Sequence, residues 1–515
     1  MSRRKEYSIA FVLFFLLVFA LLLATGTITS GWHLVDDHEY VEYLLQMKAP
    51  GGSLLSCMGD VLRADFTSRF RPLYYILRVA LTAVIGSNLV VWSVIKALET
   101  VLALFFLYLC ARQFKCSIFQ AVLFSLTVMV GPQAAVWWKL GPQECTGILF
   151  FAAGLYLLNK WLYREMGLPA KLGSLFLFLC MSLYKESFLV LISFVLVYIV
   201  YVRCQGEKLS ISSILKAIRS ELDLLLILGI IMAAELFIIV FFVGTNNVTY
   251  IGLDPSVTLE QYIFMWTDCA RTYIQWYVRF TPLLLLLLAL QFRRWKQMVG
   301  PFFLGLCVML PQMILYIKTG LQERYVIPWS FGFALFFILP LSREVFSGIW
   351  KLLYSALLVI LLLCQFQMTI READYYTWRG HSVTSVLNHV RELVQENPDI
   401  KVLAAYSPYL ESDITVAYWL LQYGYEDVYS WDEDAKTCTI IAGEKEGTVG
   451  DVKDMDVILF YNPQDRHYCY VPDIDMSGYE VTDWGTLTVG ERGKRFFRIS
   501  PSPLWECRML DALRF

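Results

Sequence analysis

The sequence predicts a mainly α-helical, polytopic membrane protein of about eleven transmembrane helices, followed by a small C-terminal α/β domain. Of its 515 residues, 57% are hydrophobic and only 17% are charged. A soluble protein of this length exposes far more charge, so most of the chain must lie in lipid. Apolar segments of spanning length recur up to about residue 370, and the pattern after that point is typical of a water-exposed domain.

The basic residues between the apolar segments predict the topology. Lys and Arg gather in alternate connections, for example at Arg112 and Lys115 and again at Arg293 and Arg294. If each such connection is cytoplasmic, the spans alternate without conflict, and both the first loop and the C-terminal tail lie outside. The predicted spans are 8–27, 89–111, 118–136, 144–161, 171–184, 187–203, 222–243, 277–292, 298–317, 326–341 and 351–369.

Two apolar stretches, residues 1–27 and 71–86, allow more than one interpretation. Residues 1–27 begin with basic residues and continue in an apolar run too long for a signal peptide, so we expect a retained first span. Residues 71–86 are short and contain Arg78, and a full crossing there would invert every later loop, so we expect a juxtamembrane helix or a re-entrant hairpin. A count of twelve or thirteen spans stays open, because 171–184 is short and 277–292 contains Arg279 and Pro282.

The chain divides into a transmembrane domain, residues 1–370, and an outer α/β domain, residues 371–515. The first outer loop of the transmembrane domain is 28–88. In the outer domain, apolar spacing from Val383 to Val394 predicts a helix. The predicted strands are KVLAAY (401–406), TCTII (437–441), DVILFYN (456–462) and KRFFRI (494–499).

Charge and motifs exclude several functional classes. A net charge of -2 provides no cationic face for nucleic acid, which we therefore exclude as a partner. No CxxC pair supports a zinc ribbon or a redox site, and no GxSxG triad, HExxH or P-loop supports a hydrolase or an ATP-driven pump. Cys438, Cys469 and Cys507 offer one disulfide if the tail is outside.

Polar residues, most of them ionisable, gather at the outward ends of the predicted spans. Charged groups at membrane depth are costly, and they usually line an aqueous cavity or pair with each other. Because these residues come from at least five segments yet share one side, they predict an outward-facing polar cavity. They are Asp36, Asp37, His38 and Glu39; Asp60, Asp65, Arg69 and Arg71; Lys139, Gln143 and Glu144; Lys185 and Glu186; and Lys318, Glu323, Arg324 and Tyr325.

The densest of these groups is DDHE, residues 36–39, directly after the first span. A structural interpretation is helix capping, because Asp is a favoured N-cap residue. Capping uses only one of Asp36 and Asp37 and gives His38 and Glu39 no role, so we interpret the group as functional. Metal binding by Asp36, Asp37 and His38 is an alternative, which makes a divalent cation the one candidate cofactor. Adjacent residues converge on one ion only if the loop helps them.

Three later segments carry cations beside apolar runs. Lys185 and Glu186 lie between two spans, where a structural ion pair and a phosphate-binding lysine both fit the sequence. Lys139 and Glu144 lie in WWKLGPQE (137–144), whose two interfacial tryptophans usually serve as membrane anchors. Arg324 stands at the entrance to a span, and its planar guanidinium matches the oxygens of an anionic head group.

One kind of chemistry needs all of these groups and no soluble nucleotide fold. In the transfer of a sugar from a lipid phosphate, the acceptor hydroxyl requires a carboxylate base. The lipid phosphate leaves readily once Arg or Lys holds its charge. These residues therefore indicate a sugar transferase at the membrane surface.

The chain resembles the GT-C superfamily of polytopic glycosyltransferases, which use polyprenyl-phosphate sugars at the outer face of the membrane. The resemblance covers about residues 1–370. The matching features are the acidic pair Asp36 and Asp37 with Tyr40 following, RPLYY (71–75), YKES (184–187) and QERYVIP (322–328).

The resemblance implies roles for individual residues. It implies that a first-loop Asp is catalytic, which by position is Asp36, with Asp37 as the second member. Many relatives have Asp-Glu there, whereas this chain has Asp-Asp-His-Glu. It also implies that basic outer-loop residues hold the donor phosphate, and we assign Arg324 first, then Lys185 and Arg71. Further candidates for substrate contact are His38, Glu39, Lys139, Glu144, Glu186 and Tyr325.

We therefore expect a multi-pass plasma-membrane glycosyltransferase with its active site and C-terminal domain outside. It would move a sugar, with inversion, from a polyprenyl-phosphate donor to a hydroxyl of a glycan, glycolipid or wall polymer. Two alternatives stay open. A non-enzymatic transporter or assembly factor for lipid-linked saccharides would also bind phosphate but would not need the first-loop Asp. A polysaccharide polymerase would use a lipid-linked oligosaccharide as its donor.

Overall fold

The computed structural model describes residues 2–206, 210–244, 257–316, 321–405, 411–433, 435–461 and 473–492. Three features discussed above lie outside these ranges. They are Lys318, the cysteines Cys469 and Cys507, and the predicted strand 494–499. Cys438 is described and is a buried free thiol.

Within the described ranges, eight helical segments are long and apolar enough to cross a membrane. The helices at their centres are α1 (Arg3–Ala24), α5 (Leu89–Gln113), α7 (Glu144–Leu162), α9 (Leu189–Arg203), α11 (Leu222–Ile238), α14 (Trp295–Leu315), α15 (Val326–Phe337) and α17 (Gly348–Glu396). The short helix α16 (Leu339–Ser342) completes the span of α15, and a π-helical turn, Ile239–Val243, completes that of α11.

The remaining helices are shorter or bent. A pair, α12 (Leu259–Tyr273) and α13 (Gln275–Ala289), forms a ninth candidate span with an 85° bend. Three apolar helices have 10–17 residues, namely α4 (Pro72–Ile85), α6 (Ile118–Met129) and α8 (Leu168–Tyr184). The amphipathic helices are α2 (Glu39–Lys48), α3 (Leu54–Asp65) and α10 (Ile211–Ser220).

The predicted fold class, a polytopic helical membrane protein with a small C-terminal sheet domain, is confirmed. Each of the eleven predicted spans coincides with one of these helices, although α6 and α8 are shorter than a usual span and α13 belongs to the bent pair. Residues 71–86 form the short helix α4, which packs against α2, α3 and α8. Its position beside the other first-loop helices agrees with the predicted juxtamembrane helix.

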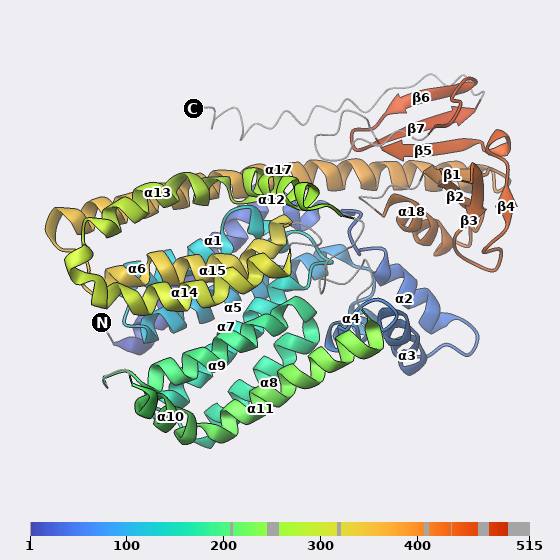
Figure 1. Cartoon of the computed structure of the whole chain (residues 1–515). Helices are drawn as coiled ribbons and strands as arrows, with labels where there is room; N and C mark the ends of the chain where they lie inside the picture. The colour runs from blue at the N-terminus through green and yellow to red at the C-terminus, as the bar shows by residue number, and fades with distance from the viewer. Residues whose placement is uncertain are drawn as a thin grey trace.

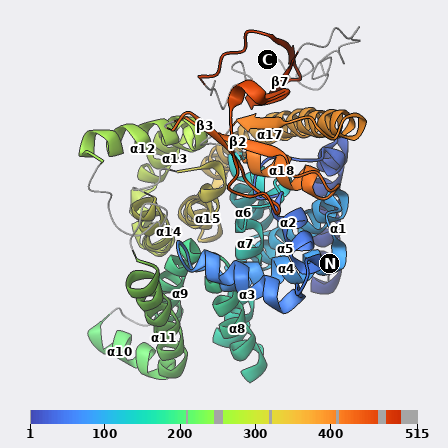
Figure 2. The ribbon, with the colours of Figure 1, turned by 90° about the vertical axis from the view of Figure 1, so that its right-hand side faces the viewer.

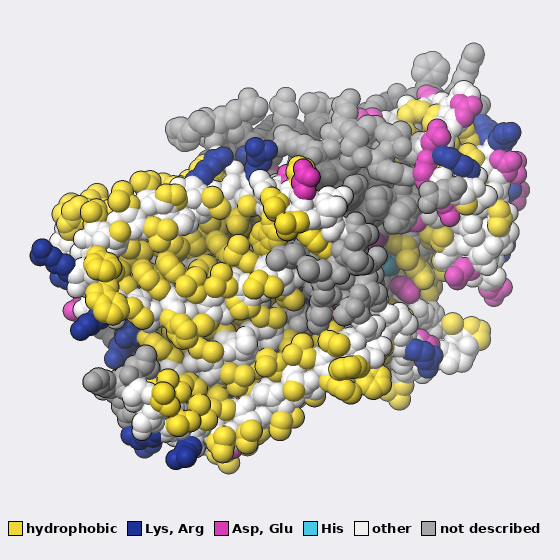
Figure 3. All heavy atoms as spheres, viewed as in Figure 1, with side chains coloured by type: hydrophobic (Ala, Val, Ile, Leu, Met, Phe, Trp, Pro, Cys, Tyr) yellow, Lys and Arg dark blue, Asp and Glu magenta, His cyan; other side chains and the backbone are white. Residues whose placement is uncertain are grey.

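Large apolar side chains cover the outer surface of the helical part. Leu16, Leu102, Phe176 and Phe242 are all exposed, although a water-soluble protein would bury most such side chains. Figure 3 shows hydrophobic side chains spread over this face, with Lys and Arg gathered at the end where the N-terminus lies. An apolar belt with charge at its ends is the surface that a bilayer stabilises.

The first loop and the C-terminal domain lie at the same end of the molecule (Figure 1). The N-terminus and α10 lie at the opposite end. The view in Figure 2 has the C-terminal domain in front, with α18 (Ser412–Leu421) close to α2, and these two helices are in contact. The prediction that the first loop and the tail share one side of the bundle agrees with this arrangement.

Helix α17 connects the two parts without a break. Its 49 residues extend for about 74 Å at about 1.5 Å per residue, roughly twice the thickness of a bilayer core. The predicted boundary between residues 370 and 371 therefore falls within a continuous helix. The helix predicted from Val383 to Val394 is the distal part of α17, and it packs on the sheet.

In the described part of the C-terminal domain, seven strands form one sheet of order β4-β3-β2-β1-β5-β7-β6. Strand β1 is parallel to β2 and β5, and the other pairings are antiparallel. Alternate residues of β1 face two apolar clusters, because successive strand side chains point to opposite faces. The strands are β1 (Val402–Ala405), β2 (Val428–Asp432), β3 (Thr437–Ile440), β4 (Val449–Gly450), β5 (Val457–Tyr461), β6 (Tyr479–Asp483) and β7 (Leu487–Arg492).

Candidate active site

The loop that follows α1 is held in shape by Asp37. The Asp37 side chain is completely buried, and its two oxygens accept hydrogen bonds from the backbone amides of His33 (2.5 Å) and Val35 (3.1 Å). These bonds stabilise a tight turn in which Leu34 and Asp36 have left-handed backbone angles, with φ of 60° and 54°. Such angles cost a non-glycine residue about 1–3 kcal/mol unless its surroundings enforce them. Burial raises the pKa of the Asp37 carboxyl.

The peptide groups before and after Asp36 are each held by a hydrogen bond. Its amide donates to Oε2 of Glu411 at 2.5 Å, and its carbonyl accepts a hydrogen bond from the guanidinium of Arg78. The half-buried side chain of Asp36 lies against Gly141, because a Cβ atom added there would be only 2.6 Å from Oδ2 of Asp36. Glycine at position 141 therefore allows the backbone before α7 to approach this carboxylate.

The electrostatic surroundings of Asp36 keep its carboxylate ionised. Burial acts to raise the pKa of this carboxyl, but the positive charges of Arg78, His38, Arg324 and Arg71 outweigh burial and lower the pKa below its usual value. Two of these cations, Arg324 and Arg71, are residues that the sequence assigns to the donor phosphate. The first loop and the later basic loops therefore lie close enough together to interact, as the sequence predicts.

Arg78 contacts several of the segments that surround Asp36. Its guanidinium lies 2.5 Å from Oε2 of Glu39 and 3.4 Å from the carbonyl of Leu140, and it stacks over the ring of Tyr40 at 4.3 Å. Through these contacts α4 holds α2, the first loop and the segment before α7 together. Burial raises the pKa of the Glu39 carboxyl to about 7, and Arg78 opposes that shift. Arg78 thus makes Glu39 part of the scaffold around Asp36.

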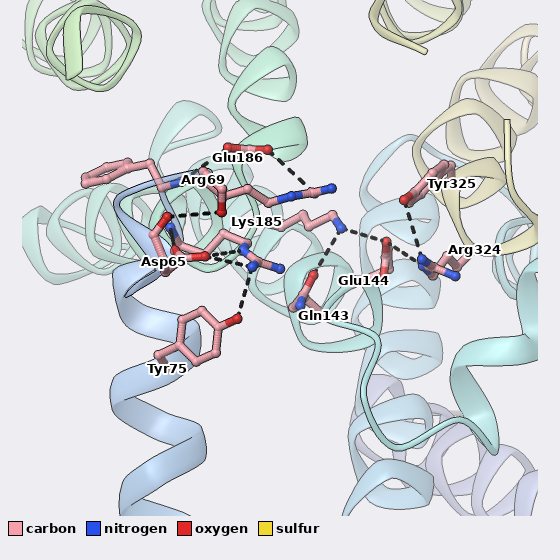
Figure 4. Close-up of polar contacts among 12 residues, drawn as sticks. Asp65, Arg69, Tyr75, Gln143, Glu144, Lys185, Glu186, Arg324 and Tyr325 are labelled. Carbon is pink, nitrogen blue, oxygen red and sulfur yellow. Dashed lines mark hydrogen bonds and ion pairs between the residues drawn. The ribbon is translucent and has the colours of Figure 1, made fainter. Parts of the chain in front are cut away.

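Two of the three predicted phosphate-binding residues, Lys185 and Arg324, form a cationic cluster around Glu144 (Figure 4). Nζ of Lys185 lies 3.1 Å from Oε1 of Glu144 and donates to Oε1 of Gln143 at 3.0 Å. Nε of Arg324 lies 3.6 Å from the same Glu144 oxygen, and its Nη2 donates to the hydroxyl of Tyr325 at 3.4 Å. Residues from α7, from the turn after α8 and from the turn before α15 therefore meet at one point.

Lys139 extends this cluster. It donates to Oε1 of Glu323, which also lies 3.8 Å from Nη1 of Arg324. The ammonium of Lys139 lies 4.5 Å from the centre of the Tyr376 ring on α17. Burial lowers the pKa of Lys139. The predicted association of Lys139 with the other outward-facing charges therefore agrees with the structure.

Arg71 and Glu186 belong to a second polar group. Asp65 accepts hydrogen bonds from Nε (3.1 Å) and Nη2 (2.7 Å) of Arg71, and Nη2 also donates to the hydroxyl of Tyr75. Glu186 lies 3.7 Å from Nη1 of Arg69 (Figure 4). The two charged residues of YKES therefore have different partners, and the structural ion pair between them that the sequence allows is replaced by pairs across the site.

The histidine of the first loop faces the C-terminal domain. Nδ1 of His38 lies 3.2 Å from Oε2 of Glu411, and its ring stacks with Tyr418 at an angle of 12°. Asp37 is meanwhile bound to backbone amides. Among the residues that the structure describes, no group of three or more His, Cys, Asp and Glu side chains could hold a metal ion. The cation site considered for Asp36, Asp37 and His38 is therefore not formed by these three side chains.

A small apolar cavity of about 10 Å³, room for about one water molecule, lies next to the cationic cluster. Tyr325 contributes to both, and it stacks on Tyr316 with ring centres 4.5 Å apart. The cavity provides an apolar surface directly beside Arg324. Its lining residues are Trp266, Ile274, Gln312, Met313, Tyr316, Leu321, Tyr325 and Trp329.

Two residues at the centre of the site were not predicted from the sequence. From the sequence, Arg78 serves only as an argument against a transmembrane span at residues 71–86. A charged residue in an apolar run is itself a signal of a functional or paired site, and that signal was available. Glu411 has no comparable local signal, since it meets Asp36 across 375 positions of the chain.

Comparison with known proteins gives a distant structural likeness. No family model and no curated protein matches the sequence. Among solved structures, the chain is similar to the crystal structure of ArnT from Cupriavidus metallidurans bound to undecaprenyl phosphate, with a TM-score of 0.47 and 12% identity over 94% of this chain and 99% of that one.

Proposed function

We propose that the protein is a membrane glycosyltransferase that moves a sugar from a polyprenyl-phosphate donor to an acceptor hydroxyl. The observation that carries this proposal is that the half-buried Asp36 side chain lies against Gly141, close in the chain to Glu144, whose Oε1 lies 3.6 Å from Nε of Arg324. A base and a phosphate-binding cation in one site are the two groups that this transfer requires.

Asp36 acts as the general base in this proposal. The acceptor oxygen attacks C1 of the donor sugar, and its proton passes to the Asp36 carboxylate. The bond between C1 and the phosphate oxygen breaks, and its electron pair leaves with the polyprenyl phosphate. Attack opposite the leaving phosphate inverts the configuration at C1. A positioned base contributes about a hundred- to ten-thousand-fold to such a rate.

The cationic cluster binds the donor phosphate. Lys139, Lys185 and Arg324 contribute three cations, and Glu144 and Glu323 contribute two carboxylates, which leaves one net positive charge. A phosphate that enters this cluster exchanges hydration for charge-assisted hydrogen bonds, the strongest kind that a side chain provides. Arg324 is the principal ligand, because its guanidinium matches two phosphate oxygens at once.

The apolar lining of the small cavity at Tyr325 is the surface on which the first part of the prenyl chain packs, once these side chains move apart to make room. It lies next to Arg324, so a lipid bound there places its phosphate in the cationic cluster. Each buried methylene group contributes about 0.8 kcal/mol, so a short stretch of chain adds substantially to affinity. The lining is mostly aromatic and aliphatic, as a prenyl chain requires.

The distribution of basic residues orients the site. Lys and Arg gather at the end of the bundle that carries the N-terminus, opposite the first loop and the C-terminal domain. Since basic ends face the cytoplasm, the proposed site opens on the outer face of the plasma membrane. Glycans, glycolipids and wall polymers are the acceptors available on that side.

Incubation of the purified protein with synthetic polyprenyl-phosphate hexoses tests the proposal. We expect release of polyprenyl phosphate that depends on an added acceptor. Asp60→Asn, an exposed acid of the same loop, is the matched control and should behave like wild type. Donor binding without release would instead support the transporter. Release only from lipid-linked oligosaccharides would support the polymerase.

A further inference from the structure

We infer that the C-terminal domain completes the active site through Glu411, which is a positioning residue for the carboxylate of Asp36. This inference rests on the proposed function, because it assigns Glu411 a part in the same reaction. It makes the outer domain a component of catalysis rather than an appendage of the membrane domain.

A single oxygen of Glu411 holds two residues of the first loop. Oε2 accepts the amide hydrogen of Asp36 at 2.5 Å and lies 3.2 Å from Nδ1 of His38. The backbone amide of Glu411 in turn donates to the carbonyl of Leu34 at 3.4 Å. Glu411 therefore binds the tight turn at three successive points, with Asp36 in the middle.

These bonds determine where the Asp36 side chain points. The φ angle of Asp36 is 54°, an angle that an Asp residue seldom adopts without support. Glu411 fixes the peptide before Asp36, and Arg78 fixes the peptide after it. With both peptide planes held, the direction of the Cα–Cβ bond is set, and Gly141 leaves little room for the carboxylate to move.

The position of Glu411 is itself built into the fold. It directly precedes α18, where the Ser412 hydroxyl donates to the carbonyl of Ala405 at the end of β1. On the loop side, Trp32 lies edge-on to Trp419 at 5.5 Å, and Leu34 lies in the same apolar cluster as Leu420. The loop and the domain therefore share a hydrophobic core, and this shared core holds Glu411 beside the first loop.

Glu411 is separate from the groups proposed to bind the donor. The cationic cluster is formed by residues of α7, of the turn after α8 and of the turn before α15, whereas the Glu411 side chain binds Asp36 and His38 of the first loop. Loss of Glu411 should therefore impair the base without weakening donor binding. The expected signature is a fall in kcat at a nearly constant KM for the donor.

Three substitutions test this inference. In Glu411→Ala we expect kcat to fall about a hundred-fold, the usual consequence of an ångström-scale misplacement, with the donor KM within about two-fold of wild type. In Glu411→Gln the amide oxygen still accepts the Asp36 amide hydrogen, so activity should return to within about ten-fold of wild type. Glu411→Asp keeps the charge but withdraws the oxygen, so its kcat should resemble that of Glu411→Ala. The exposed Glu444→Ala is the control.

A second readout separates this inference from the proposed function. Hydrogen exchange at the first-loop amides reports whether Glu411 holds the turn, whatever reaction the protein performs. We expect faster exchange in Glu411→Ala and near-wild-type exchange in Glu411→Gln, with both variants folded. Unchanged exchange and unchanged kcat in a folded Glu411→Ala variant would overturn the inference, as would a loss confined to donor KM. Absence of transfer in wild type contradicts the proposed function alone, since the exchange result still decides the role of Glu411.

Discussion

Nε of Arg78 lies 2.5 Å from Oε2 of Glu39, and both side chains are almost completely buried at the end of the helical bundle that carries the C-terminal domain. The pair joins α4 to α2, and the same guanidinium binds the carbonyl of Asp36. A buried ion pair stabilises a fold only weakly compared with apolar packing, but removal of one partner leaves an uncompensated charge.

Arg78→Met should therefore be strongly destabilising. The substitution leaves Glu39 buried without its partner, and we expect a loss of about 3–5 kcal/mol, measured as a lower Tm in detergent. The double variant Arg78→Met with Glu39→Gln should recover part of that loss, because the remaining charge is removed. Equal Tm values for the single and the double variant would show that the unpaired charge of Glu39 is not the cause of the destabilisation.

Arg324→Ala should weaken donor binding. A phosphate loses a charge-assisted hydrogen bond, so the apparent donor KM should rise by the equivalent of about 1.5–3 kcal/mol, which is roughly ten- to a hundred-fold. Arg63→Ala is the matched control, because Arg63 pairs with Asp60 on the exposed surface of α3, where an ion pair contributes little. An unchanged donor KM in folded Arg324→Ala protein would remove Arg324 from the donor site.

The stability of the first loop should depend on pH through His38. Burial acts to lower the pKa of His38, but the hydrogen bond and charge of Glu411 raise it from 6.5 to about 9. The folded pKa exceeds the ordinary value, so this stabilisation is complete below about pH 6.5 and is lost as the pH rises through 9.

The Tm of wild type should thus decrease as the pH is raised from about 7.5 to about 9.5. This range lies above the pKa of about 7 of Glu39, so the decrease reports on His38. His38→Gln should have a lower Tm at pH 7.5 and a flatter profile across this range. If wild type and His38→Gln show the same pH dependence, the pair of His38 with Glu411 does not stabilise the loop.

Topology is open to a direct test. Gln205 follows α9 and Glu446 lies in the C-terminal domain, and both are exposed. In whole cells, a membrane-impermeant thiol reagent should label Glu446→Cys above the parental background, whereas Gln205→Cys should need permeabilised cells. Labelling of both variants from the same side would overturn the proposed orientation.

The sequence predicted the helical fold well because hydropathy is a local property. Each of the eleven predicted spans became a helix, and the strands β1, β3 and β5 were recognised from their short apolar runs. The sequence did not predict β2, β4, β6 or β7. Of these, β4 has only two residues, and β6 is largely exposed and carries little apolar signal. The continuity of α17 past residue 370 was hidden because its composition changes from apolar to amphipathic while its helical period persists.

The candidate site was predicted in part. The convergence of Lys139, Glu144, Lys185 and Arg324 followed from their shared position at the ends of spans. The roles of Asp37 in folding the loop and of Glu411 in holding Asp36 depend on tertiary contacts, which residue spacing does not reveal.

The rate of sugar transfer by Asp36→Asn tests the central claim most directly. Asn has the size of Asp, and the Asp36 bonds to Glu411 and Arg78 use its backbone, so the fold and donor binding should be retained. The account predicts a fall in kcat of about a hundred- to ten-thousand-fold with little change in donor affinity. Full activity of Asp36→Asn, measured on folded protein that binds donor normally, would contradict it.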